Sequence, residues 1–354
     1  MINLKNANIL VTGGTGFIGS HLIEALLKQK ANVISFSLET DPLSYFCSQK
    51  LDKKVKSIIL DICEFDKVFN LITRFQIDYI FHLAAQSLVE IAFHNPQKTL
   101  QTNILGTVNI LESARLYPRI KGIVVASSDK AYGKILYSCH SDQAKRVEES
   151  RSLSASLLAY ARDPSTSLGM THRVKYIETD PLKGDHPYEA SKSAADLISY
   201  SYHKTYQLPV TVTRFGNVYG EGDLNFSRII PGTIKSIVKN EILEIRSDGQ
   251  YVRDYLYVKD VVTGYILLAK NIGKIKGEAF NFGSKETLSV LQVIKLMEKH
   301  LGKKIKYKIL NTAKNEIPYQ SLDYAKIQKK LGWKPKYSLK STACEIYNWY
   351  KSIL

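Results

Sequence analysis

The sequence of 354 residues has little of what marks secreted, membrane and zinc-binding proteins. Its four cysteines are scattered without a Cys-x-x-Cys pair, which argues against a disulfide scaffold and a zinc ribbon. No stretch approaches the roughly 18 consecutive apolar residues of a membrane helix. The N-terminus leads directly into an apolar strand pattern and leaves no room for a signal peptide. We therefore expect a globular, cytoplasmic protein that has no membrane partner.

The sequence also lacks any block of like charges, although its formal net charge is +16. Such a charge is compatible with nucleic acid or an anionic small molecule as a partner. Because the lysines are spread along the whole chain, the pattern favours a lysine-rich solvated surface. A cleft for a phosphorylated substrate is an alternative, and a nucleic-acid partner is the least supported. The eight histidines show no metal-ligand spacing, so we expect no metal site.

The N-terminal half alternates short β-rich runs with helical patterns. Strands are predicted at 8–11, 32–36, 57–60, 79–83, 122–126 and 210–214, and helices at 20–28, 96–115 and 191–206. This alternation predicts an α/β fold with a Rossmann-type doubly wound parallel sheet. Longer connections follow, with late helices at 288–301 and 339–352, and they indicate a smaller mixed α/β substrate lobe. We predict a Rossmann domain at 1–216 and a mainly substrate-binding lobe at 217–354, some segments of which return to the first domain.

Residues 138–174 have a different composition from the rest of the chain. They hold eight serines, four of the eleven arginines, and no Ile, Phe or Trp. Such a shift is typical of an inserted surface loop. A functional lid is the alternative, because long loops often carry function. The absence of large aromatic anchors favours the insertion.

A glycine-rich segment joins the first predicted strand to the first predicted helix. Gly13 permits a tight turn, Gly16 lets the backbone approach a pyrophosphate, and Gly19 lets helix and strand pack closely. The helix N-terminus then presents free N–H groups and a partial positive charge to the phosphates. A plain βα turn is the alternative. The strand and helix on either side favour a dinucleotide site, which also includes Thr15, Phe17 and Ile18.

The second strand normally indicates which nicotinamide cofactor binds. An acidic residue at its end favours NAD and an arginine favours NADP. This chain has Ser37 there, with Glu39 as a weak acidic candidate, and no arginine in the first 50 residues. NAD is therefore favoured over NADP. After the third strand, Asp61 and Ile62 are predicted to contact the adenine, although Asp61 can equally be a helix N-cap.

Polar residues with catalytic potential follow the strand at 122–126. Ser128 lies at its carboxyl end, the edge at which open α/β sheets bind ligands. Tyr188 and Lys192 lie four residues apart, so both belong to one face of a helix. A lysine ammonium in that position can stabilise a tyrosine phenolate, whose ordinary pKa is near 10. Together with the glycine loop, these residues indicate a nicotinamide-dependent active site.

At this point the sequence resembles the extended short-chain dehydrogenase/reductase family, the NAD-dependent nucleotide-sugar epimerases and dehydratases. The resemblance covers nearly the whole chain apart from 138–174. Its motifs are residues 12–19, 82–86, Asn103 with Gly106-Thr107, Tyr188 with Lys192, 214–220 and 253–255. It implies Ser128 as the family's Ser/Thr, Tyr188 as its base and Lys192 as its lysine. It further implies cofactor contacts at Leu83, Ala84 and Ala85, and substrate contacts at Gln86, Asn217, Arg228 and Arg253, unless these arginines are structural.

Within the family, Asp129-Lys130 resembles the CDP-glucose 4,6-dehydratase branch. The resemblance implies an NAD-dependent dehydratase that converts a nucleotide-diphosphate hexose to a 4-keto-6-deoxy sugar for polysaccharide synthesis. Tyr188 would take the 4-hydroxyl proton, Lys130 the C5 proton, and Asp129 would protonate the departing 6-hydroxyl. A 4-epimerase, a GDP-, dTDP- or UDP-hexose dehydratase, and a non-catalytic NAD-binding protein are the alternatives. Asp129-Lys130 can also be a surface ion pair.

The helices at 96–115 and 191–206 carry broad apolar faces. In the resembling family the corresponding helices pair as the four-helix bundle of a dimer. We therefore expect a homodimer, with purely intramolecular packing as the alternative.

Overall fold

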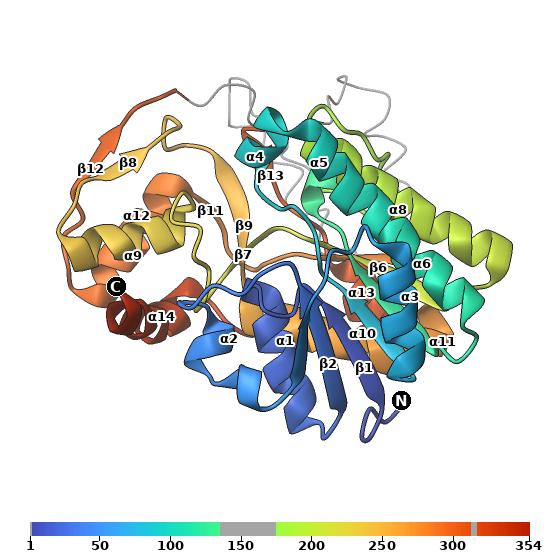
Figure 1. Ribbon diagram of the computed structural model, residues 1–354. Coiled ribbons are helices and arrows are strands. Elements are labelled where there is room, and N and C mark those ends of the chain that lie inside the picture. The colour runs from blue at the N-terminus through green and yellow to red at the C-terminus, as the bar shows by residue number, and fades with distance from the viewer. Residues whose placement is uncertain (1, 135–174, 313–316) are drawn as a thin grey trace, which may run out of the picture. The chain divides into compact units, whose positions relative to one another are not determined.

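Seven parallel strands form the central sheet of the structure, a computed structural model that describes residues 2–134, 175–312 and 317–354 (Figure 1). Within these ranges the strand order is β10-β6-β5-β4-β1-β2-β3. The strands are β1 (Asn8–Thr12), β2 (Asn32–Ser37), β3 (Lys56–Ile59), β4 (Tyr79–His82), β5 (Gly122–Ala126), β6 (Val210–Phe215) and β10 (Ala279–Phe282). The order reverses between β1 and β4, as in a doubly wound sheet. The predicted Rossmann-type α/β fold is confirmed, and the predicted insertion at 138–174 lies outside the described residues.

Alternating side chains of the strands face two separate layers of helices. In β1, Ile9 and Val11 belong to one hydrophobic cluster, whereas Leu10 belongs to the other. This is the period of two of a strand that is buried on both faces. The first layer consists of α1 (Phe17–Lys28), α10 (Val258–Lys270), α11 (Ile272–Ile275) and α13 (Ala325–Leu331). The second consists of α3 (Phe65–Arg74), α6 (Gly106–Leu116) and α8 (Pro187–Tyr206).

Short elements connect the strands and helices of this core. They are α2 (Tyr45–Ser48), α4 (Val89–His94), α5 (Pro96–Leu100), the 3₁₀ turns η1 (Leu51–Lys53) and η3 (Asp129–Tyr132), and the π-helical turn η2 (Gln101–Leu105). The predicted helix at 96–115 is therefore three consecutive pieces, α5, η2 and α6. A π-helical turn inside a helix is rare and frequently lies at a functional site.

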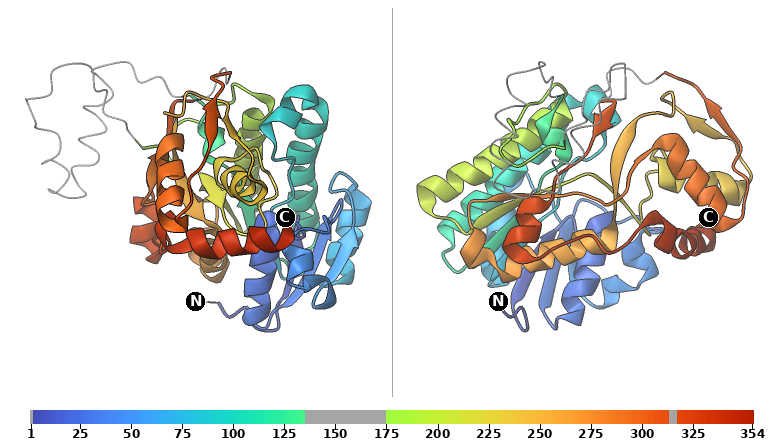
Figure 2. Two further views of the ribbon diagram at one scale, coloured as in Figure 1. Left: turned by 90° about the vertical axis from the view of Figure 1, so that its left-hand side faces the viewer. Right: turned by 180° about the vertical axis from the view of Figure 1, so that it is seen from behind.

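A smaller mixed sheet and three helices build most of the C-terminal part. In the described residues, β7 (Asn217–Tyr219), β11 (Thr287–Ser289) and β13 (Tyr319–Gln320) join β9 (Val252–Tyr257). β8 (Leu243–Ile245) pairs with β12 (Tyr307–Ile309). The helices are α9 (Ile229–Lys239), α12 (Val290–Leu301) and α14 (Leu339–Ile353), with α14 beside α12 and α9 (Figure 2). No helix in the described ranges has the length and apolarity that crossing a membrane requires.

Two boundaries differ from the sequence prediction in ways that affect the site. The helix predicted at 191–206 begins at Pro187, where His186 is the N-cap and its ring accepts a hydrogen bond from the Tyr188 amide. Proline favours the first helical position because its φ is already helical and no N–H partner is needed there. Tyr188 therefore lies in the first turn of α8. β10, from the C-terminal part, completes the edge of the central sheet beside β6.

Candidate active site

Four loops meet at the carboxyl edge of the central sheet. They follow β1, β4, β5 and β6, and because these strands are parallel, the loops emerge at the same edge. Open α/β sheets bind ligands outside this edge, at the point where the strand order reverses. The predicted phosphate loop and the predicted catalytic residues therefore belong to one region.

The loop after β1 has a backbone that excludes side chains at two positions. Gly13 has a φ of +68°, and a Cβ there would lie 2.9 Å from the amide nitrogen of Ala84. A Cβ on Gly19 would lie 2.3 Å from the carbonyl oxygen of Gly13, so α1 can begin this close to β1 only without a side chain. At Gly16 a Cβ would meet only that same oxygen, at 3.3 Å, which leaves the backbone open to a ligand.

The N-terminus of α1 has no side-chain cap. Gly16 is the N-cap residue, and the first turn, with Phe17 and Ile18, contains no acidic side chain. The N–H groups and the positive end of the helix dipole favour an anion at such a terminus. The loop therefore fits the pyrophosphate of a dinucleotide.

The end of β2 is hydrogen bonded to this loop. The Thr15 amide donates to Ser37 Oγ (3.2 Å), and the Thr15 hydroxyl donates to the Glu39 carbonyl oxygen (2.8 Å). Glu39 itself is exposed. Ser37, which the sequence left without a clear role, thus supports the shape of the phosphate loop.

The predicted adenine contacts, Asp61 and Ile62, have other partners in the structure. Asp61 accepts a hydrogen bond from the Cys63 amide (2.9 Å) and forms an ion pair with Lys98 (3.1 Å). Because α3 has Glu64 as its N-cap residue, the alternative that Asp61 caps a helix is wrong. Ile62 is 3% exposed and belongs to the hydrophobic core on the α3 and α6 side.

The segment after β4 is held by Thr12 and His82. Thr12 Oγ1 accepts hydrogen bonds from the amides of Leu83 (3.1 Å) and Ala84 (3.0 Å) and contacts His82 Nδ1 at 2.9 Å. His82 Nε2 lies 3.1 Å from Thr107 Oγ1. Burial lowers the pKa of His82 to about 3, which keeps the ring neutral. His82 of β4 therefore links β1 to α6 by hydrogen bonds. Ala85 belongs to the segment that follows it.

Asn103 links this segment to α8. Its side chain accepts from the Gln86 amide (2.7 Å) and donates to the Gln86 carbonyl (3.0 Å) and to Ser191 Oγ (2.8 Å). It lies in the π-helical turn η2, which turns it toward these partners. Sequence reasoning assigned Asn103 only to a family motif. The irregular helix was the signal, and it is visible only in the structure.

Three of the predicted catalytic side chains come together at the end of β5. Ser128 Oγ donates to Asp129 Oδ1 (2.9 Å) and accepts from the Lys130 amide (3.2 Å), and the charge of Asp129 acts on the Tyr188 hydroxyl. Asp129 and Tyr188 are both buried. Burial raises the pKa of Asp129 against the opposing pull of Lys130, and burial raises the pKa of Tyr188 to about 12. Both side chains are thus biased toward their protonated forms.

Lys192 is buried one helical turn beyond Tyr188. Its ammonium donates to the carbonyl oxygen of Ala126 at 2.9 Å. Burial lowers the pKa of Lys192 from 10.5 to about 8. The predicted stabilisation of a Tyr188 phenolate by this ammonium stays a prediction, because the carbonyl of Ala126 is the partner that the structure gives it.

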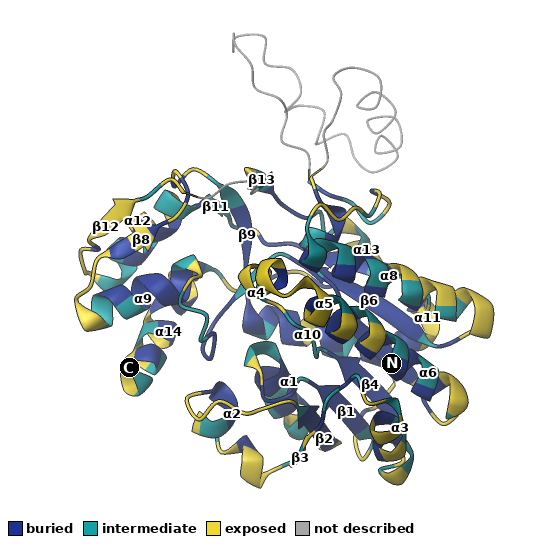
Figure 3. Ribbon diagram, turned by 45° about the horizontal axis from the view of Figure 1, so that its top comes forward, coloured by how far each residue is buried: buried dark blue, intermediate teal, exposed yellow. Residues whose placement is uncertain are grey.

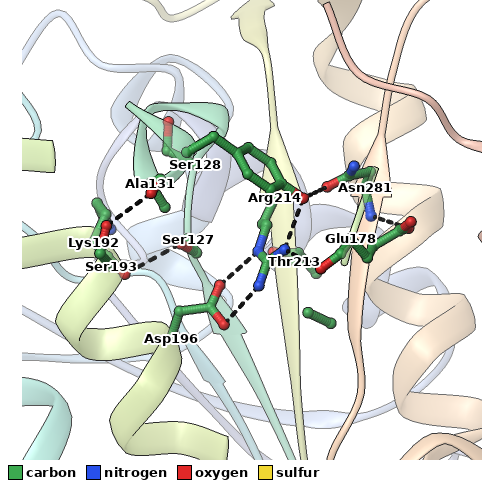
Figure 4. A network of polar contacts seen from close by, with 12 residues as sticks. Ser127, Ser128, Ala131, Glu178, Lys192, Ser193, Asp196, Thr213, Arg214 and Asn281 are labelled. Carbon is green, nitrogen blue, oxygen red and sulfur yellow. Dashed lines mark hydrogen bonds and ion pairs between the residues drawn. The ribbon is translucent and has the colours of Figure 1, made fainter. Parts of the chain in front are cut away.

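A buried ion pair supports the turn that carries the catalytic residues (Figure 4). Arg214 of β6 binds Asp196 of α8 through Nε (2.7 Å) and Nη2 (3.0 Å), and its Nη1 donates to the Tyr132 hydroxyl (2.7 Å). Tyr132, the last residue of η3, in turn donates to Asn281 Oδ1 (2.7 Å). The turn η3 is thereby fastened to β6, α8 and β10.

The predicted substrate arginines approach the catalytic cluster from two directions. Arg253 is 7% exposed, and its positive charge acts on the Asp129 carboxyl group. Arg228 is the N-cap residue of α9, and its Nη1 donates to both carboxylate oxygens of Asp223 (3.1 Å each). Its positive charge opposes the rise in the pKa of the Tyr188 hydroxyl. Asn217 is half-buried at the start of β7. The structure therefore brings both arginines to the predicted site.

Residues 9–283 match the NAD dependent epimerase/dehydratase family. The chain belongs to this family. It is 31% identical to the dTDP-glucose 4,6-dehydratase of Haemophilus influenzae, over 97% of each chain. Two other relatives are a UDP-glucuronate 4-epimerase of Thermodesulfobacterium geofontis (30% identical, 97% of this chain and 95% of the relative) and a CDP-glucose 4,6-dehydratase of Salmonella typhimurium (29%, 98% and 91%).

Solved structures of family members share the fold. The UDP-glucose 4-epimerase of Thermotoga maritima with UDP-glucose superimposes with a TM-score of 0.79 at 28% identity, covering 98% of this chain and 99% of that one. The dTDP-glucose 4,6-dehydratase of Bacillus anthracis in complex with NAD gives a TM-score of 0.76 at 27% identity, covering 98% and 97%. The family and cofactor predicted from the sequence are thus confirmed. Because both dehydratases and epimerases match, family membership does not determine which reaction the protein catalyses. The residues of the site must be used for that distinction.

Proposed function

We propose that the protein is an NAD-dependent nucleotide-hexose 4,6-dehydratase, most similar to the CDP-glucose 4,6-dehydratases. The observation that carries the proposal is the arrangement of Asp129 and Lys130 directly beside Ser128. Asp129 is buried, and the raised pKa of its carboxyl group favours the protonated form that can donate to a leaving hydroxyl. A 4-epimerase leaves the C6–O bond of its substrate intact and has no need of that acid.

The first step oxidises C4 of the hexose. When bound, NAD supplies the two-electron chemistry by accepting the C4 hydride and later returning it to C6. Tyr188 takes the proton of the 4-hydroxyl, and the Ser128 hydroxyl donates to the 4-oxygen. Burial holds the Tyr188 phenol neutral in the protein alone, so its activation needs the positive charge of the oxidised cofactor nearby.

The second step removes water from C5 and C6. Lys130 takes the C5 proton, and the electron pair of that bond moves into the enolate of the 4-ketone. Collapse of the enolate then forms the C5–C6 double bond as the C6–O bond breaks. Asp129 gives its proton to the departing oxygen, which leaves as water. On reduction at C6, the Lys130 proton returns to C5. The proton gained by Tyr188 balances the one lost by Asp129, so the net change is loss of one water.

We propose that Arg228 and Arg253 hold the anionic part of the substrate. Their guanidinium groups present planar donors that suit a pyrophosphate. Arg253 also lies close enough to act on Asp129, so substrate binding and the acid are linked electrostatically. Gln86 and Asn217 are proposed to bind sugar hydroxyls. Lys192 and the segment 83–85 are proposed to contact the cofactor.

The experiment that tests the proposal uses purified protein with NAD and a panel of CDP-, dTDP-, GDP- and UDP-hexoses. Product mass and sugar configuration are followed together. A dehydratase gives a product lighter by one water, and the nucleotide hexose that is converted identifies the substrate. A C4 epimer of unchanged mass refutes dehydration and assigns the protein to the epimerases. Asp129→Asn separates the two further, because it slows dehydration and leaves oxidation at C4 in place.

We also propose that the enzyme works in the cytoplasm as a homodimer. Exposed residues lie on α4, α6 and α8 of the second helical layer (Figure 3), and several of those on α4, at the ends of α6 and on α8 are apolar. These apolar residues are Val89, Ile91, Phe93, Leu105, Leu116, Leu197, Tyr200 and Tyr206. Apolar patches of this kind mark interaction surfaces, and a second copy of α8 would cover the patch.

A further inference from the structure

A buried glutamine from the C-terminal part reaches the catalytic turn η3. Gln320 is 0% exposed, and its Oε1 accepts a hydrogen bond from Lys130 Nζ at 2.6 Å. Its Nε2 donates to the main-chain oxygen of Asp129 at 3.0 Å. The amide can take only this orientation, because a lysine amine donates while a carbonyl oxygen only accepts. Gln320 therefore binds both residues of the Asp129-Lys130 pair at once.

The backbone around Gln320 is held firmly. β13 pairs with β9, where Gln320 is opposite Arg253. The next residues are bound by the buried Asp254, which accepts from Ser321 Oγ (2.8 Å) and from the Leu322 amide (2.8 Å). The Gln320 side chain thus projects from a fixed strand, as a group that orients a reacting side chain must.

We propose that Gln320 is a positioning residue that aims the Lys130 side chain at C5 of the hexose without adding a negative charge beside it. The inference rests on the proposed dehydratase function and deepens it. It adds a residue from β13, about 190 positions along the chain, to the machinery of the second step.

The neutral amide is the important feature of this contact. Two carboxyl groups already act on Lys130, those of Asp129 on η3 and Glu189 on α8, while Arg253 on β9 acts on Asp129. A third carboxylate in place of the Gln320 amide would favour the ammonium form of Lys130, which has no lone pair for the C5 proton. The amide oxygen instead accepts one N–H of Lys130 and carries no negative charge. In the step, the C5–H bond breaks, an N–H bond forms on Lys130, and the electron pair moves into the enolate of the 4-ketone.

The test uses Gln320→Glu and Gln320→Met in the full-length protein with NAD and the best nucleotide hexose of the panel. Oxidation at C4 is followed by the absorbance of reduced cofactor, and the second step by water loss and by deuterium incorporation at C5. We expect both variants to keep C4 oxidation, which also shows that they fold. Gln320→Met should slow the second step by about 10- to 100-fold across the pH range, because the amine loses its orientation.

Gln320→Glu should move the pH profile of the second step upward by about 1 pH unit or more, with the rate recovering in alkali, because a nearby carboxylate favours the ammonium. Gln328→Glu makes the same change at an exposed position of α13 and should leave the profile in place. A Gln320→Glu profile identical to the wild type, or a wild-type rate in Gln320→Met, overturns the inference alone. Wild-type protein that oxidises C4 but releases no water overturns the proposed function, and the inference with it.

Discussion

Replacing Lys192 with methionine is expected to stabilise the cofactor-free protein while it abolishes turnover. The Lys192 ammonium is buried, and its pKa falls from 10.5 to about 8 on folding. This difference corresponds to about 3 kcal/mol of unfavourable free energy for the charged form in the folded state. Methionine has a similar shape without the charge, so it removes this cost.

The same substitution loses one hydrogen bond, so the net gain is smaller. The Ala126 carbonyl, 2.9 Å from the ammonium, is left without that donor. An unsatisfied buried acceptor costs about 1–2 kcal/mol, which leaves a net stabilisation of about 2 kcal/mol. With an unfolding entropy of roughly 2.1 cal/mol/K per residue, that is a rise in Tm of about 3 °C for a chain of this size.

The pH dependence gives this prediction its sign. Because the pKa of Lys192 is lower in the folded protein, the unfolded chain binds more protons between about pH 8 and 10.5, and the wild type gains stability as pH rises through this window. The advantage of the variant is therefore largest at or below about pH 8 and shrinks toward about pH 10. Thermal unfolding at both pH values measures it, with Lys304→Met, whose wild-type side chain is 94% exposed, as the control. A variant less stable than the wild type at neutral pH, or an equal difference at both pH values, refutes the reasoning.

Three further predictions follow from the site and the helices around it. Tyr188→Phe keeps the ring but removes the proton acceptor, and turnover of the nucleotide sugar should fall by about 10²- to 10⁴-fold. Asp196→Leu leaves the Arg214 guanidinium without its buried partner, and urea unfolding should show a loss of about 3–5 kcal/mol. Leu197→Glu places a charge in the exposed apolar patch of α8, and light scattering should show a monomer in place of a dimer.

Each of these variants has a matched control at an exposed position. Tyr307→Phe on β12 should keep full turnover, and an active Tyr188→Phe would remove that tyrosine from the mechanism. Lys67→Met breaks the exposed pair with Glu64 and should cost less than about 1 kcal/mol; an equal loss in Asp196→Leu would contradict its structural role. Lys295→Glu on α12 should leave the oligomeric state as it is, and a dimer that survives Leu197→Glu excludes this patch as the interface.

The fold was largely predictable because its signals are local. Six of the seven strands of the sheet were predicted from their own apolar runs, whereas β10 was not. Gly13 and Gly19 are required by backbone geometry within the loop itself. The start of α8 was missed by four residues, although Pro187 after His186 is a usual helix start. The break of the helix at 96–115 into three pieces carried no such signal. A π-helical turn depends on tertiary partners, here those of Asn103.

The candidate site was predictable in its residue types and less so in its contacts. Sequence spacing and the family resemblance point to Ser128, Asp129 and Tyr188; in the structure Ser128 donates a hydrogen bond to Asp129, whose charge acts on Tyr188. The same spacing suggested that Lys192 faces the Tyr188 hydroxyl, whereas in the structure the Lys192 ammonium donates a hydrogen bond to the Ala126 carbonyl oxygen. Position on one helix face does not determine where a long flexible side chain ends.

The sequence by itself determined the parallel sheet, the phosphate loop and the candidate catalytic side chains. Those features depend on neighbours a few residues apart, through backbone conformation and the periods of strands and helices. Only the tertiary structure decided that Gln320 accepts a hydrogen bond from Lys130 and that Asp61 forms an ion pair with Lys98. It also decided that the charge of Arg253 lies near the Asp129 carboxyl group. These contacts join segments far apart in the chain, and no local pattern encodes them, because they exist only once the two parts of the chain have packed together.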